Sequence, residues 1–262
     1  MLKHWLPRLG LAFSLITVGA AAQAESLSIA ATPVPHAELL EFIQEDLQEQ
    51  GIDLDIKVFT DYVQPNQQVA EGQIDANFFQ HKPYLDSFNQ ERGTDLVSLG
   101  VIHVEPFGAY SQKIDAISDL KPGALVAIPN DPSNGARALL LLQKQGLIEL
   151  KDPTNVLATS RDISSNPHKL KFKELEAAAL PRVLPDVDLA LINTNYALEA
   201  GLNPLEDALF IEGDESPYAN LVAVSASQKD DPRFAILMET LQSPKVRQFI
   251  IDTYQGAIVP AF

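Results

Sequence analysis

The chain has 262 residues, with 35 acidic side chains against 19 of Lys and Arg, which gives a formal net charge of −16 at pH 7. Such an acidic protein is a poor partner for nucleic acid or anionic lipid, since both carry negative charge. It contains no cysteine, which excludes disulfides and thiol chemistry. The length suffices for one large or two small domains stabilised by hydrophobic packing alone.

Residues 1–24 have the pattern of a signal peptide. Lys3 and Arg8 form a positive amino-terminal region, residues 9–22 are mostly apolar, and an A-Q-A cleavage motif ends at Ala24. The apolar run is shorter than the roughly 20 residues that a spanning helix needs. We therefore expect cleavage after Ala24, export, and no stable membrane insertion.

The first part of the mature chain alternates predicted strands and helices. Apolar residues at helical spacing predict a long helix, and alternating apolar and polar residues predict strands. The elements expected here are a strand at 25–34, a helix at 36–50 closed by Gly51, a strand at 52–59, a short helix from Asp61 or Asn66 to near Gly72, a strand at 74–78 and a helix from Lys82-Pro83.

The same alternation continues to the end of the chain and predicts an α/β protein with mostly parallel sheets. The elements expected are extended runs at 96–110 and 218–225, strands at 125–128, 170–175 and 189–192, a helix at 133–145 closed by Gly146, and two helices within 232–254 that break at Ser243-Pro244. The two long runs bracket the middle of the chain. This favours two lobes joined by two crossing strands, with the last helices returning to the first lobe and a ligand in the cleft between them.

Arg137 is the strongest single candidate for a binding residue. It follows IPNDPSNGA, where Ser133 or Asn134 can cap a helix whose exposed N–H groups favour an anion. An arginine in the first turn would add a bidentate donor for a carboxylate. The alternative is a surface arginine on a helix that packs its leucines inward.

The segment NFFQHKPYLDSF (77–88) places aromatic and polar side chains where a strand passes into a helix. Phe79, His81 and Tyr84 would supply apolar walls with polar edges, as ligand pockets have. Tyr62 lies at the equivalent junction one unit earlier. The alternative places the phenylalanines in the core and makes His81 a helix cap.

Two asparagines are further candidates. Asn193 follows a buried strand, and its amide can either cap the next helix or bind a ligand through one donor and one acceptor group. Asn220 begins the second extended run, just after the acidic stretch EGDES, and alone is a weak signal.

Enzyme motifs do not stand out in the sequence. There is no GxSxG, HExxH or GxxxxGK pattern, and the histidines 36, 81, 103 and 168 are scattered rather than spaced as metal ligands, with His103-Val104-Glu105 alone a weak pattern. We therefore expect binding groups without a catalytic set, a metal or a cofactor.

Seven segments spread over nearly the whole mature chain carry a family resemblance. They are ATPVPHAELL (31–40), DYVQPNQ (61–67), IDANFFQHKPYLD (74–86), AIPNDPSNGARALLLLQ (127–143), ELEAAALPR (174–182), LALINTNYAL (189–198) and ESPYANL (215–221). In order and spacing they resemble the methionine-binding, NlpA-type family of ABC-importer substrate-binding proteins. The resemblance implies an α/β, two-lobed periplasmic-binding-protein fold (type 2), with two α/β domains joined by two crossover strands and the ligand in the cleft.

The resemblance also implies roles for individual residues. Arg137 is similar to the residue that holds the ligand carboxylate, helped by Asn134 in the same loop. Asn193 and Asn220 resemble the amides that hold the α-amino and carboxylate groups. The residues that resemble the family's wall around the ligand thioether are Tyr62, Phe79, His81 and Tyr84.

The function implied is a receptor, not an enzyme, that captures L- or D-methionine and delivers it to an ABC importer permease. The alternative is a receptor for another small amino acid or a methionine-containing dipeptide. The family is usually anchored through a lipidated cysteine, whereas this sequence has Ala24-Glu25 there, so we expect free diffusion in the periplasm. The expected division is a signal peptide at 1–24, lobe 1 at 25–108 plus 222–262, and lobe 2 at 109–221.

Overall fold

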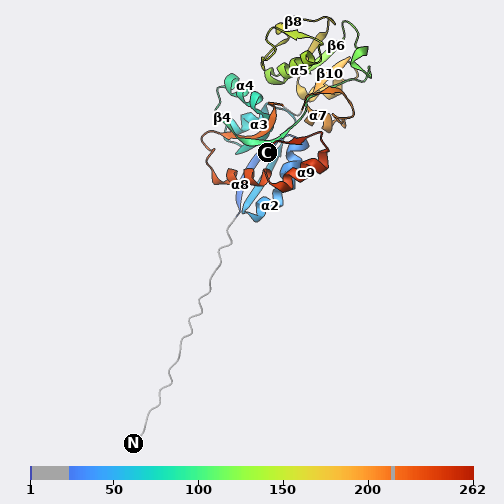
Figure 1. Ribbon diagram of the computed structural model, residues 1–262. Helices are drawn as coiled ribbons and strands as arrows, with labels where there is room; N and C mark the ends of the chain where they lie inside the picture. Colours follow the sequence, from blue (N-terminus) through green and yellow to red (C-terminus); the bar gives the residue numbers. More distant parts are fainter. Residues whose placement is uncertain (2–23, 214–215) are drawn as a thin grey trace.

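The computed structural model describes residue 1, residues 24–213 and residues 216–262, so residues 2–23 of the expected signal peptide lie outside the described residues. The chain forms two adjacent lobes, each built on a sheet flanked by helices (Figure 1). No helix among the described residues is both long and apolar enough to cross a membrane.

The first sheet has six strands in the order β13-β4-β12-β3-β1-β2. Its strands are β1 (Glu25–Ala31), β2 (Ile52–Val58), β3 (Ala76–His81), β4 (Leu96–Val104), β12 (Ala219–Ser225) and β13 (Val259–Pro260). β1 runs parallel to β2 and β3, whereas β12 runs antiparallel to β3 and β4. The sheet is therefore mixed, and the expectation of mostly parallel pairing is wrong where β12 returns from the other lobe.

Helices cover both faces of the first sheet (Figure 1). They are η1 (Pro33–Ala37), α1 (Glu38–Phe42), α2 (Gln44–Glu49), α3 (Gln64–Ala70), α4 (Lys82–Arg92), α8 (Pro232–Leu241) and α9 (Pro244–Tyr254). The single helix expected at 36–50 is interrupted at Ile43, where ψ opens to 0°. Phe234 of α8 and Ile250 of α9 join the same buried cluster as Phe78 of β3, so the last helices return to the first lobe as expected.

The second sheet has five strands in the order β11-β5-β10-β6-β9. The elements of this lobe are β5 (Gly108–Tyr110), η2 (Ile117–Asp119), β6 (Leu125–Pro129), α5 (Pro132–Lys144), β7 (Glu149–Leu150), η3 (Ser160–Asp162), β8 (Ile163–Ser165), β9 (Lys171–Leu175), η4 (Ala177–Ala179), α6 (Leu180–Val183), β10 (Leu189–Ile192), α7 (Thr194–Glu199) and β11 (Ala208–Ile211). β6 pairs in parallel with β9 and β10, and β5 pairs antiparallel with β10 and β11.

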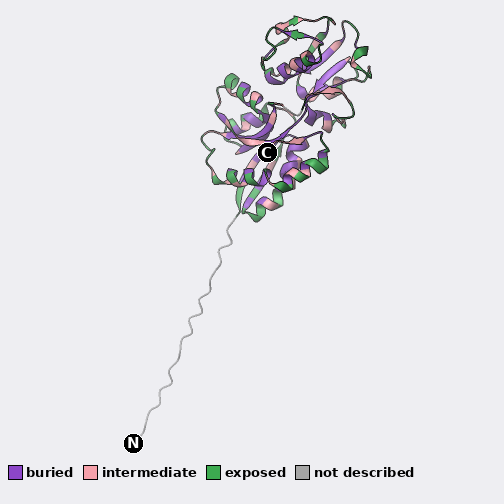
Figure 2. Cartoon of the chain, viewed as in Figure 1, coloured by how far each residue is buried: buried purple, intermediate pink, exposed green. Residues whose placement is uncertain are grey.

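The chain passes between the lobes at the ends of the two extended runs. The run expected at 96–110 is divided at Glu105–Phe107, with β4 in the first sheet and β5 in the second. The return path leads from β11 of the second sheet to β12 of the first. Buried residues form a separate core in each lobe, with exposed helix faces outside (Figure 2). Residues near the crossings therefore meet between two independently packed bodies.

Candidate functional site

A narrow cavity of about 280 Å³ lies between the lobes. It is lined by Tyr62, Phe79, Gln80, His81, Tyr84, Glu105, Asn134, Arg137, Asn193 and Asn220. All eight residues expected at the site are in this lining, drawn from six different segments of the chain. Their role in binding a ligand stays a prediction, while their convergence on one cavity is a property of the fold.

His81 ends β3 and begins α4, and its two ring nitrogens serve different lobes. Nδ1 accepts a hydrogen bond from the Tyr84 backbone N–H at 3.3 Å, which caps α4. Nε2 lies 3.1 Å from Oδ1 of Asn134 on the second lobe. Burial, and then the positive charge of Arg137, lower the pKa of His81 to about 3, so the ring is neutral near pH 7. His81 therefore both caps α4 and lines the cavity.

Three aromatic rings in the lining of the cavity pack against one another. The ring centroids of Tyr62, Phe79 and Tyr84 lie 5.7 to 5.9 Å from one another. The Tyr84 hydroxyl donates to the Tyr62 carbonyl at 2.8 Å, and the Tyr62 hydroxyl donates to Oδ1 of Asn195 at 2.6 Å. The second of these bonds joins the lobes. The hydroxyls are therefore occupied, and the ring faces and edges are left to form an apolar wall.

Asp131, rather than Ser133 or Asn134, caps the helix that carries Arg137. Its extended backbone precedes Pro132, and its carboxylate accepts the Asn134 N–H at 2.8 Å. The sequence-based choice of cap is wrong because the helix begins earlier than expected. For the same reason Arg137 lies in the second turn, not the first.

Arg137 is buried, with only 2% of its side chain exposed, so the alternative of a surface arginine does not hold. Its Nε and Nη2 donate to the Glu212 carboxylate at 2.8 and 2.5 Å, and Nη2 also donates to the Glu105 carbonyl at 2.8 Å. Burial opposes its charge, but the negative charge of Glu212 outweighs this and raises the pKa of Arg137. Among the described residues, Nη1 has no hydrogen-bond partner. One guanidinium nitrogen is thus available to a ligand.

Two of the three candidate asparagines, Asn134 and Asn193, are hydrogen-bonded to each other. Oδ1 of Asn134 accepts from Nδ2 of Asn193 at 3.0 Å, and Nδ2 of Asn134 donates to Asp131. Asn193 occupies the position before α7 without making a capping bond, and within the described part of the chain its buried Oδ1 has no partner. Asn220 accepts a hydrogen bond at 3.2 Å from Nε2 of His36. The unpaired Oδ1 of Asn193 is therefore an acceptor that a ligand ammonium group can use.

Glu105 is a site residue that sequence reasoning did not select. Oε1 lies 2.8 Å from Nε2 of His103 and 3.4 Å from Nε2 of His36, and Oε2 accepts the Asn195 N–H at 3.1 Å. Burial opposes its ionisation, but the hydrogen bond from His103 holds the pKa of Glu105 below its usual value. Burial lowers the pKa of His36 to about 4. The cavity therefore contains a buried carboxylate.

The expectation that the histidines are scattered is wrong for His36 and His103, which lie together with Glu105. The ligating atoms of His36, His103 and Glu105 lie within 4.8 Å of one another, and all three residues are buried. Such a group has the composition of a metal site, but here Nε2 of His103 is hydrogen-bonded directly to the Glu105 carboxylate and Nε2 of His36 to Oδ1 of Asn220. The weak HVE pattern in the sequence was the available signal.

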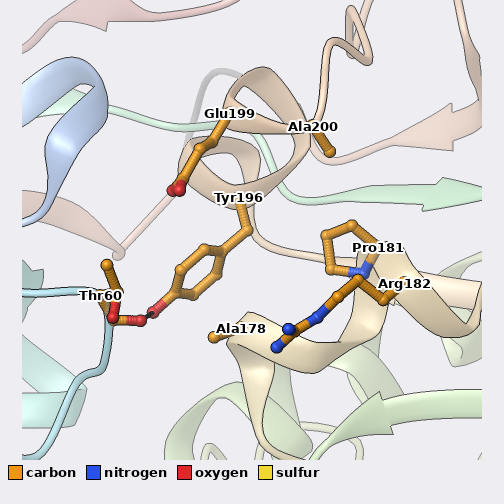
Figure 3. Close-up of a pocket in the computed structure, with 7 residues that line it drawn as sticks. All are labelled: Thr60, Ala178, Pro181, Arg182, Tyr196, Glu199 and Ala200. Carbon is orange, nitrogen blue, oxygen red and sulfur yellow. Dashed lines mark hydrogen bonds between the residues drawn. The ribbon is translucent and has the colours of Figure 1, made fainter.

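A second, wider hollow lies beside the cavity, since its lining residue Tyr196 packs against Tyr62 of the cavity. Figure 3 shows the residues that line this hollow. It holds about 750 Å³ and is lined by Thr60, Ala178, Pro181, Arg182, Tyr196, Glu199 and Ala200. The Tyr196 hydroxyl donates to the Thr60 carbonyl at 3.1 Å, and its ring centroid lies 5.0 Å from that of Tyr62. This tyrosine pair separates the hollow from the cavity. Because Arg182 and Glu199 are exposed, the hollow lacks the buried charges that make the narrow cavity the better ligand site.

The model of the family described as NlpA lipoprotein matches residues 27–262. The chain belongs to the NlpA lipoprotein family. Within it, the D-methionine-binding lipoprotein MetQ of Salmonella typhi is 47% identical over 211 residues, which cover 80% of this chain and 78% of that protein. The D-methionine-binding lipoprotein MetQ of Escherichia coli is 44% identical over 225 residues, covering 85% and 82%.

Solved structures of the NlpA type share the fold. A nutrient-binding protein from Burkholderia cenocepacia, bound to methionine, superposes with a TM-score of 0.87 at 48% identity, covering 90% of this chain and 100% of that one. The lipoprotein Tp32 of Treponema pallidum gives a TM-score of 0.88 at 42% identity, covering 91% and 100%. The expected α/β, two-lobed fold is thereby confirmed.

Proposed function

We propose that this protein is a periplasmic receptor that captures methionine and delivers it to the permease of an ABC importer. The observation that carries the proposal is the cavity between the lobes, which is lined both by a buried guanidinium and by a group of aromatic rings. An α-amino acid with an apolar tail has this distribution of groups. Relatives named for methionine binding and a structural neighbour with bound methionine support the choice of ligand.

The ligand carboxylate is assigned to Nη1 of Arg137, the guanidinium nitrogen without a partner among the described residues. Charge-assisted hydrogen bonds of this kind are short and strong. Asn134 supports this end through its bond to Asn193. The ligand ammonium is assigned to Oδ1 of Asn193 and the carboxylate of Glu105, which give it an acceptor and a counter-charge, with Asn220 beside them.

The thioether is assigned to the ring group of Tyr62, Phe79, His81 and Tyr84. Sulfur against an aromatic ring contributes about 0.3–1.5 kcal/mol per contact. Burial of an apolar side chain of this size adds about 1.5–3 kcal/mol. The rings thus favour methionine over smaller or more polar amino acids.

Closure of the lobes is part of the proposed binding cycle. The hydrogen bonds Tyr62–Asn195 and Tyr196–Thr60 join the lobes at one side of the cavity, and His81–Asn134 joins them at the other. These bonds form only when the lobes are close together. The proposed lobe boundaries are 25–108 plus 222–262 for the first lobe and 109–221 for the second. The protein acts as a binding protein and carries out no reaction on its ligand.

The proposed location is the periplasm, after cleavage following Ala24. Several relatives are named as lipoproteins, but this sequence has no cysteine to carry a lipid. Expression in a Gram-negative host should yield protein in the osmotic-shock fraction with the intact mass of residues 25–262. Protein retained in the membrane fraction, or a mass increased by acyl chains, would contradict this location.

The ligand itself is tested by denaturing protein purified from cells and analysing the released small molecules by mass spectrometry. Methionine is the expected product, and titration of refolded protein with L- and D-methionine should show saturable binding. Release of a different amino acid would favour the alternative receptor. Release of a methionine dipeptide would require a larger cavity than the narrow one described above.

A further inference from the structure

Glu212 covers one edge of the guanidinium that is proposed to hold the ligand. Its two carboxylate oxygens accept from Nε and Nη2 of Arg137 at 2.8 and 2.5 Å, a bidentate arrangement. The side chain of Glu212 is 13% exposed and that of Arg137 is 2% exposed. The pair is therefore largely shielded from water, and its charges are only weakly screened.

The crossing between the lobes fixes the orientation of Glu212. The Phe107 N–H donates to Oε2 of Glu212 at 3.2 Å, and the Glu212 N–H donates to the Phe107 carbonyl at 2.9 Å. The rings of Phe107 and Tyr218 lie 5.0 and 4.3 Å from Cζ of Arg137. Glu212 is thus held by backbone bonds on one side and by the guanidinium on the other. It is not among the residues that line the cavity.

The charges around the cavity decide which ligands it accepts. The positive charge of Arg137 is matched by Glu212, and Glu105 contributes a second negative charge. His36 and His81 are buried and neutral at pH 7. A ligand with a carboxylate and no ammonium would therefore add an anion to a site without net positive charge. A zwitterion brings its own positive charge to Glu105.

We propose that Glu212 determines the charge specificity of the cavity. By neutralising Arg137 and occupying its Nε/Nη2 edge, it makes the site accept a zwitterionic amino acid and reject an anion of the same shape. This inference rests on the proposed function as a methionine receptor. It gives a reason why the site selects a ligand that carries no net charge. Glu212 acts through Arg137 and is a positioning and charge-balancing residue.

The test compares three ligands of nearly equal shape in wild type and Glu212→Gln. L-Methionine is a zwitterion, 4-(methylthio)butanoate lacks the amino group and is an anion, and L-methioninol lacks the carboxylate and is a cation. Affinities for the two analogues are measured by displacement of labelled methionine at pH 7. Relative to methionine, Glu212→Gln should bind the anion at least tenfold tighter than wild type does and the cation more weakly. A tenfold change corresponds to about 1.4 kcal/mol.

The opposite directions separate a charge effect from a loosened structure, which would weaken all three ligands together. Glu149→Gln, which removes one exposed carboxylate on β7 outside the cavity lining, should leave the ratios unchanged. Glu212→Asp keeps the charge and should retain the wild-type order of ligands. Ratios that stay within about threefold of wild type in Glu212→Gln would overturn the inference. Failure of wild-type protein to bind methionine would instead overturn the proposed receptor.

Discussion

Replacing Arg137 by alanine is the perturbation whose effect on binding follows most directly from the structure. Nη1 carries two N–H groups, has no partner among the described residues, and belongs to a side chain that is 2% exposed. A hydrogen bond to a charged group contributes about 1.5–3 kcal/mol. The loss of one such bond to a buried carboxylate therefore weakens methionine binding by about 2 kcal/mol, or roughly 30-fold.

Stability has to be separated from binding in this experiment. Arg137→Ala leaves Glu212 without its partner, and breaking a buried ion pair from one side costs about 3–5 kcal/mol of folding free energy. The double variant Arg137→Ala/Glu212→Gln removes the stranded charge and should recover part of that stability without recovering affinity. Titration calorimetry with methionine measures the affinity, and urea unfolding measures the stability. Binding within threefold of wild type in a folded Arg137→Ala protein would refute the assignment of the carboxylate.

Two further predictions concern lobe closure and pH. Tyr62→Phe removes only the 2.6 Å bond to Asn195, so methionine affinity should fall by about 0.5–1.5 kcal/mol while the thermal unfolding temperature changes little; unchanged affinity by calorimetry would show that this bond does not stabilise the bound state. Because burial lowers the pKa of His36 to about 4 and of His81 to about 3, the unfolded chain takes up protons below pH 6.5 that the folded chain does not. The urea-derived free energy of unfolding should therefore fall between pH 7 and pH 5, by up to about 1.4 kcal/mol per pH unit for each histidine. His81→Gln should reduce that slope, and an equal slope in the variant would contradict a neutral buried His81.

The elements that were predicted well carry strong local signals. The helix predicted from Lys82-Pro83 begins there, and the helix predicted to close at Gly146 ends at Lys144, with Gly146 at φ +72°. The predicted break at Ser243-Pro244 separates α8 from α9. Proline at a helix start and glycine at its end act through their own backbone preferences, so they can be read without tertiary structure. The short strands β7 and β11 carry no such pattern and were not predicted, whereas the four-residue strand β10 was predicted from its run of buried apolar residues.

The cap of α5 was mispredicted for a local reason that several residues share. Asp131, Ser133 and Asn134 are all suitable caps, and the sequence does not say which of them adopts the extended backbone. Pro132 at the first helical position supports Asp131. The choice moves Arg137 by one turn, but it does not move it out of the cavity.

The sequence predicted which residues line the candidate site better than it predicted the contacts among them. Aromatic and amide residues at the ends of strands, together with the family resemblance, identified eight residues that the fold brings together. Glu105 and Glu212 were missed because their importance depends on partners far away in the sequence: Glu105 meets His36 and Asn195, and Glu212 meets Arg137. The weak HVE pattern was the local signal for Glu105, whereas Glu212 stands in the acidic stretch EGDES and carried none.

A crystal structure of the protein with bound methionine tests the central claim most directly. The account predicts that the ligand lies between the lobes, with its carboxylate within hydrogen-bond distance of Nη1 of Arg137 and its sulfur against the rings of Tyr62, Phe79 and Tyr84. A ligand with its carboxylate turned away from Arg137, or bound in the wider hollow beside Tyr196, would contradict it.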